Sequence, residues 1–88
     1  MAKRKEYSDE QIAAAIGQAL KSLRKEKGLS QSDVYLAAGL ERNTLQKYDS
    51  GRVARPMFSN IIKIAEVMEI TPGIIFDRAY EILKENNG

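Results

Sequence analysis

The chain has 88 residues, of which 43% are hydrophobic and 30% charged, a composition typical of one soluble globular domain. It contains no cysteine or histidine, which excludes a disulfide framework and the usual zinc ligands, so we expect no metal and no cofactor. No apolar run reaches the roughly 18 residues of a membrane span, and the polar start MAKRKEYSDEQ lacks the apolar middle of a secretory signal. We therefore expect a cytoplasmic protein without a membrane partner.

The net charge of +2 is unevenly distributed along the chain. Residues 1–63 hold 12 Lys or Arg against 7 Asp or Glu, whereas residues 64–88 hold 2 against 5. A basic N-terminal two-thirds suits a polyanionic partner, but scattered solubilising charge explains it equally well.

The first predicted helix begins after a capping-box pattern at Ser8 and Gln11 and ends at Gly28. A second capping pattern, Ser30 with Asp33, starts a short helix that ends before Gly39. The apolar residues of the first helix recur at helical spacing: Ile12, Ile16, Leu20 and Leu23.

A third helix is expected from about Arg42 to Ser50, with Leu45 and Tyr48 on one face. Two short helices joined through a glycine turn are typical of a helix-turn-helix. The segment RVARPM then forms a surface connection, Phe58 to Met68 forms a fourth helix, and Thr71-Pro72 begins a fifth. The fold class is therefore all-α.

The ordered segments LRKEKGLSQSDV, AAGLERNTLQKYDSG, RPMF and IIKIAEVMEITPGIIF resemble the bacteriophage repressor and Cro family of helix-turn-helix proteins, over about two-thirds of the chain. The resemblance implies a five-helix, lambda-repressor-like DNA-binding domain. It further implies a transcriptional regulator, a repressor by this comparison, that reads a short palindromic operator at the nucleoid. The short length is similar to that of restriction-modification controller proteins and small phage or plasmid repressors.

A recognition helix must bury one face and offer long polar side chains to base edges in the major groove. On the third predicted helix, the side chains free to do this are Arg42, Asn43, Gln46 and Lys47. Arginine or lysine can bond guanine, and asparagine or glutamine can bond adenine. An ordinary solvated helix face is the alternative interpretation.

Gln31 follows the capping Ser30, where its side chain and the free amides of the helix can bind a phosphate, and the resemblance implies the same contact. A plain capping role is the alternative. The resemblance also implies DNA backbone contacts by residues that flank the recognition helix: Thr44, Ser50, Arg52 and Arg55.

The resemblance implies a structural ion pair between Arg24 and Asp49 beneath the helix-turn-helix, although Asp49 is shorter than the glutamate usual there. Four further positions depart from the family pattern: Tyr35 in place of a small alanine, Glu41 in place of the Ser or Thr cap, Met57 in place of a basic residue, and Glu69 in place of a turn glycine.

The fifth predicted helix is apolar over a wide arc, and surplus apolar surface often marks an interface. We expect a homodimer through this helix, with an interface made by Phe76, Ala79, Tyr80 and Leu83. The alternative is a helix that only closes the core. The predicted organisation is a flexible basic arm at 1–7, a single DNA-binding domain at 8–85 and a frayed tail at 86–88.

Two other classes of function compete with DNA binding. An enzyme is disfavoured, because the chain has no histidine, cysteine, glycine-rich phosphate loop or clustered carboxylates, and no catalytic residue is assigned. A protein-interaction module, such as an antitoxin or adaptor on the same scaffold, stays open. The polar residues at Arg42, Asn43 and Lys47 favour double-stranded DNA as the partner, and no motif for a small-molecule ligand is evident.

Overall fold

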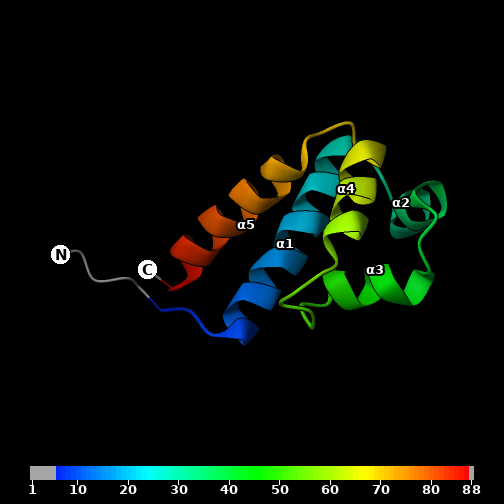
Figure 1. Ribbon diagram of the computed structural model, residues 1–88. Helices are drawn as coiled ribbons and strands as arrows, with labels where there is room; N and C mark the ends of the chain where they lie inside the picture. The colour runs from blue at the N-terminus through cyan, green and yellow to red at the C-terminus, as the bar shows by residue number, and fades with distance from the viewer. Residues whose placement is uncertain (1–5, 88) are drawn as a thin grey trace.

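The structure, a computed structural model, describes residues 6–87, and within this range the chain forms five α-helices and no strand. The helices are α1 (Asp9–Lys27), α2 (Gln31–Ala38), α3 (Arg42–Asp49), α4 (Phe58–Val67) and α5 (Pro72–Asn87). Long α1 lies between antiparallel α5 on one side and α3 on the other, and α2 packs against α3 and α4 (Figure 1). The predicted all-α fold class is confirmed. Most of the predicted basic arm falls on residues 1–5, outside the described range.

The helix boundaries follow the capping signals in the sequence. The Ser8 hydroxyl accepts a hydrogen bond from the Gln11 backbone N–H, while the Gln11 side chain accepts one from the Ser8 backbone N–H. Ser30 and Asp33 form the same reciprocal pair at the start of α2. Both helices end at a glycine in the left-handed conformation, so the two predicted capping boxes and their stops are confirmed.

The core takes at least one large side chain from every helix. The largest fully buried side chains are Leu20, Val34, Leu45, Ile61, Ile64, Met68 and Ile75. Tyr35, whose ring is larger than the alanine of the family pattern, lies half-buried at the edge of this core, and α2 and α3 still contact each other. The tyrosine is accommodated because its neighbour Val34, and not Tyr35, is the fully buried residue of α2.

The end of α5 corrects the prediction of a frayed tail at 86–88. Asn86 and Asn87 belong to α5, and the Asn87 side chain accepts a hydrogen bond of 2.7 Å from Gln11 Nε2 at the start of α1. Near the end of α1, Glu26 forms a second link to α5, an ion pair of 2.6 Å with Arg78. The hydrogen bond from Arg78 lowers the pKa of the Glu26 carboxyl. The polar composition of the tail concealed the bond between Asn87 and Gln11, because the two residues lie 76 positions apart. Gly88 lies outside the described residues.

Two departures from the family pattern have local structural consequences. Glu69 adopts a left-handed backbone conformation, with φ of 58°, at the turn into α5, which explains why a glycine is usual there. Glu41 is the N-cap of α3 but its side chain makes no capping hydrogen bond, so the first turn of α3 lacks this support.

The end of α3 lies unusually close to the backbone of α1. A Cβ atom placed on Gly17, in the middle of α1, would lie 2.6 Å from the carbonyl oxygen of Asp49 and 2.9 Å from that of Tyr48. On the other side of the same contact, a Cβ on Gly51 would lie 3.1 Å from the Ala14 Cα. The two glycines therefore permit a backbone-to-backbone approach that any other residue would push apart.

We predict that Gly17→Ala lowers the free energy of unfolding by about 1–3 kcal/mol, because the added methyl group collides with two carbonyl oxygens that cannot rotate away. Gly73→Ala is the matched control, since a Cβ there would meet only Thr71 Oγ1 at 3.8 Å. Urea unfolding followed by circular dichroism measures both. A Gly17→Ala protein as stable as the control would contradict the close approach.

Candidate nucleic-acid interface

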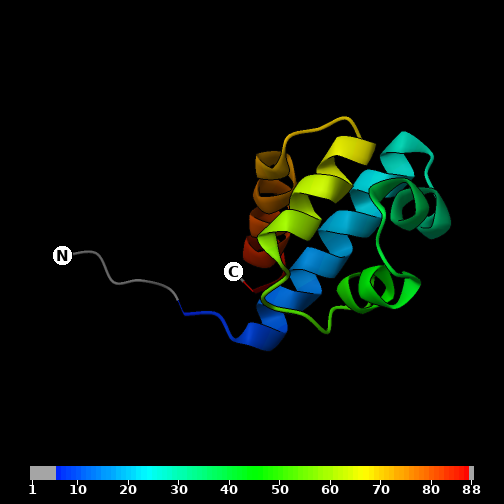
Figure 2. The ribbon, with the colours of Figure 1, turned by 45° about the vertical axis from the view of Figure 1, so that its right-hand side comes forward.

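α3 has one buried side and one exposed side. Leu45 is completely buried and Tyr48 is 5% exposed, and both pack into the core. Arg42, Asn43 and Lys47 are exposed, and in both views no other helix covers the outer side of α3 (Figures 1 and 2). The predicted base-contacting residues thus lie together on a solvent-facing surface, with the half-buried Gln46 and Thr44 at its borders.

The start of α2 carries the predicted phosphate-binding residue. Ser30 caps the helix, and the hydrogen bond from the Ser30 backbone N–H lowers the pKa of the Asp33 carboxyl, which favours the charged, cap-forming state. Gln31 is the first residue of the helix and is half-buried. The first N–H groups of a helix have no partner within the helix, so this end of α2 favours an anion.

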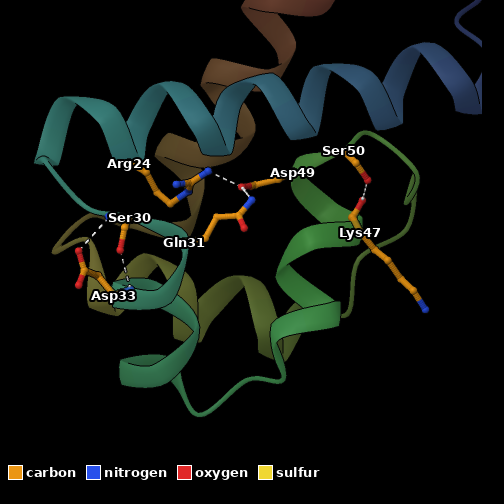
Figure 3. Close-up of polar contacts among 7 residues, drawn as sticks. All are labelled: Arg24, Ser30, Gln31, Asp33, Lys47, Asp49 and Ser50. Atoms are coloured by element: carbon orange, nitrogen blue, oxygen red, sulfur yellow. Dashed lines mark hydrogen bonds and ion pairs between the residues drawn. The ribbon is translucent and has the colours of Figure 1, made fainter.

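A network of three side chains joins α1, α2 and α3 (Figure 3). Arg24 of α1 forms an ion pair with Asp49 at the end of α3, and the Asp49 side chain is 2% exposed. Gln31 donates a hydrogen bond of 2.8 Å from its Nε2 to the same carboxylate oxygen. The short aspartate side chain therefore reaches both partners. Sequence analysis predicted an ion pair between Arg24 and Asp49 and, separately, a phosphate-binding role for Gln31. It did not predict the hydrogen bond between Gln31 and Asp49.

The segment after α3 is anchored to the core by a tyrosine hydroxyl. Tyr48 Oη accepts hydrogen bonds from the Met57 backbone N–H at 3.2 Å and from Asn60 Nδ2 at 3.0 Å. At the start of the segment, the Ser50 hydroxyl donates to the Lys47 carbonyl and accepts from Arg52 Nε at 3.0 Å. Arg52 is thereby held beside the end of α3.

The remaining predicted phosphate-contacting residue lies elsewhere. Arg55 is 88% exposed and its guanidinium is 3.6 Å from the Asp9 carboxylate at the start of α1. It also lines an apolar groove of about 440 Å³ between α1, α5 and the segment that precedes α4. Arg55 thus sits beside the groove, apart from the residues gathered on α3.

The same groove contains the residues predicted for a dimer interface. Ala79 and Leu83 are each 8% exposed and form its floor, where they pack in the protein's own core. Phe76 and Tyr80 are 41% and 57% exposed on its wall, and the facing wall holds Phe58, at 66% exposed, which sequence analysis did not assign to an interface. Phe58 was missed because helical periodicity placed it with the core residues of α4.

Two negative findings hold for the described part of the chain. Residues 6–87 contain no group of three or more acidic side chains placed to hold a metal ion. Across the same residues, no helix has the length and apolar character needed to cross a membrane.

Comparison with known proteins agrees with this geometry. Residues 20–75 match the model of the helix-turn-helix family HTH_3, so the chain belongs to this family. The chain is similar to the restriction-modification controller protein C.AhdI from Aeromonas hydrophila, with 33% identity, a TM-score of 0.68, and coverage of 73% of this chain and 96% of that one. A hypothetical transcription factor, NHTF from Neisseria, shares the fold at 20% identity, with a TM-score of 0.66 and 85% of each chain covered. A comparison with curated protein sequences found no match.

We predict that Tyr48→Phe lowers the free energy of unfolding by about 1–2 kcal/mol, because the part-buried donors of Met57 and Asn60 lose their acceptor. Tyr35→Phe is the control, since no hydrogen bond of its hydroxyl is found among the described residues. Denaturant titration compares the two variants. Equal stability would show that the Tyr48 hydroxyl does not anchor the segment.

Proposed function

We propose that the protein is a transcriptional regulator that binds double-stranded DNA with α3 in the major groove. The observation that carries this proposal is that α3 has one buried and one exposed side. Leu45 and Tyr48 are buried in the core, whereas Arg42, Asn43 and Lys47 are exposed to solvent. Long donors and acceptors on a rigid helix are what base recognition requires, and each good two-point contact gives about 1–3 kcal/mol of discrimination. Membership of the helix-turn-helix family supports the same conclusion.

The proposed contacts divide into two groups. Arg42, Asn43, Gln46 and Lys47 read base edges, and a second set holds the DNA backbone: Gln31, Thr44, Ser50, Arg52 and Arg55. The proposal is for binding without catalysis, and for repression by occupation of a palindromic operator. It also assigns residues 8–85 to a single DNA-binding domain and the protein to the cytoplasm, at the nucleoid.

We predict that Arg42→Ala and Lys47→Ala each lower the preference for the operator over random duplex by at least about tenfold, because each removes a base contact. The operator is first selected from a random duplex pool with the wild-type protein. Lys63→Ala is the charge-matched control, since Lys63 is exposed on α4 and belongs to neither set of proposed contacts.

Binding is measured by fluorescence anisotropy at several salt concentrations. The wild-type affinity should fall steeply with added salt, because phosphate contacts release counterions. No binding to any duplex at low salt would overturn the proposal and favour an antitoxin or adaptor. Unchanged preference in both folded variants would remove the site assignment alone.

We further propose that the DNA-binding form is a homodimer that pairs through α5. One recognition helix covers only a few base pairs, whereas a two-fold pair presents two helices to half-sites about 34 Å apart. The exposed rings of Phe58, Phe76 and Tyr80 line both walls of the α5 groove, so a second copy placed across the two-fold axis can exchange an aromatic side chain with it.

We predict that Phe76→Asp and Tyr80→Asp each raise the dimer dissociation constant by at least about tenfold, because the buried aromatic area is lost on both sides of the two-fold axis. Leu83 is unsuitable for this test because its burial in the core would make an acidic residue unfold the protein. The control is Leu36→Asp, at a position 72% exposed on α2 and outside the groove. Sedimentation that shows an unaltered dimer in both groove variants would contradict this interface.

A further inference from the structure

Asp49 occupies an unexpected position for an acidic residue in a protein that binds a polyanion. It lies at the end of α3, 3% exposed, and one of its oxygens, Oδ2, is shared by Arg24 and Gln31 (Figure 3). Its other oxygen, Oδ1, is buried and makes no hydrogen bond within the described residues. The ion pair with Arg24 alone would explain the presence of an acid, but it does not explain the bond to Gln31.

We infer that Asp49 is a positioning residue for DNA binding, which holds the Gln31 amide so that its second hydrogen faces a phosphate. This inference rests on the proposed function. The Gln31 amide nitrogen carries two hydrogens, and one of them is donated to Asp49 at 2.8 Å. A glutamine side chain has three rotatable bonds, and fixing its end before binding removes part of the entropy cost of ordering it on the DNA.

The geometry also explains why an oxygen shared with Arg24 can hold the Gln31 side chain in place. Arg24 fixes Asp49, since its guanidinium and the carboxylate are both largely buried, with side-chain exposures of 12% and 2%. Arg24 thereby balances the negative charge of the Asp49 carboxylate. Gln31 then needs only to donate a hydrogen bond to it, which an uncharged amide can do. Because Gln31 is the first residue of α2, its side chain lies at the same end as the backbone N–H groups of Gln31 and Ser32, which precede the capped N–H of Asp33.

The inference makes a prediction opposite in sign to simple charge repulsion. Removal of a carboxylate near DNA should tighten binding if the only effect is Coulombic. We expect Asp49→Asn to weaken binding to duplex DNA about threefold to tenfold, because an uncharged amide oxygen holds Arg24 and Gln31 less firmly than the carboxylate does. Glu41→Gln is the matched control, since Glu41 is an exposed acid at the other end of α3 with no capping bond, and it should tighten binding.

A double-mutant cycle separates positioning of Gln31 from a merely structural role. Gln31→Met removes the donor but keeps the Arg24–Asp49 pair, so it should fold and should weaken binding at least as much as Asp49→Asn does. If Asp49 acts through Gln31, then Asp49→Asn has no further effect on affinity in the Gln31→Met background. If Asp49 only supports the orientation of α3, the two effects multiply.

Two more measurements keep the test decisive if Asp49→Asn is poorly folded. The double variant Gln31→Glu with Asp49→Asn reverses the donor and acceptor and leaves an acid near Arg24, so it should recover the melting temperature but not the affinity, because a glutamate has no hydrogen to offer a phosphate. The ratio of operator to random-duplex affinity should stay unchanged in Gln31→Met, since phosphate contacts carry no sequence information.

The outcomes are distinguishable from failure of the proposed function. If the wild-type protein shows no salt-dependent duplex binding, the function itself is wrong. If the wild type binds, any one of three results overturns the inference alone. Asp49→Asn could tighten DNA binding as Glu41→Gln does, or the effects of Asp49→Asn and Gln31→Met on affinity could multiply. The double variant Gln31→Glu with Asp49→Asn could also recover the wild-type affinity. Circular dichroism at the assay temperature confirms that each variant compared is folded.

Discussion

The close approach of α3 to α1 determines the position of α3, the proposed recognition helix. Gly17 lets the carbonyl groups of Tyr48 and Asp49 lie against the α1 backbone, and Gly51 lets the chain leave along the same surface. Close packing leaves no freedom at such a contact, because a shift of a few tenths of an ångström produces a collision. The buried pair of Arg24 and Asp49 forms beside it, so the end of α3 is fixed by backbone sterics and by charge at once.

These anchors are concentrated in the second half of α3. Tyr48 and Asp49 hold the last turn of α3. At the first turn, the N-cap residue Glu41 makes no side-chain capping bond, so this turn depends on the burial of Leu45 one turn later. A helix held in this way has a stiff end and a freer end. The two ends carry different exposed residues, with Lys47 near the stiff end and Arg42 and Asn43 at the freer end. Local adjustment during the proposed base recognition would therefore cost least at Arg42 and Asn43.

The features that sequence analysis predicted well are those with local signals. The helix boundaries followed from Ser8, Ser30 and their partners three residues later, and the exposed face of α3 followed from the spacing of Leu45 and Tyr48. Gly17 was missed because a single glycine inside a helical pattern is tolerated, and its reason is visible only in the partner backbone. The bond from Gln31 to Asp49 joins residues 18 positions apart, and no periodicity links them.

The fold places the basic and acidic parts of the sequence on different sides of the molecule. The acidic final third of the sequence contains α5, which lies on the far side of α1 from α3 (Figure 1). The exposed cations Arg42, Lys47 and Arg52 lie on or beside α3. A molecule with opposite charge at its two sides experiences a torque in the field of a polyanion, which steers the basic side toward it before contact. Because α5 lies across α1 from α3, the proposed pairing through α5 leaves the exposed side of α3 uncovered.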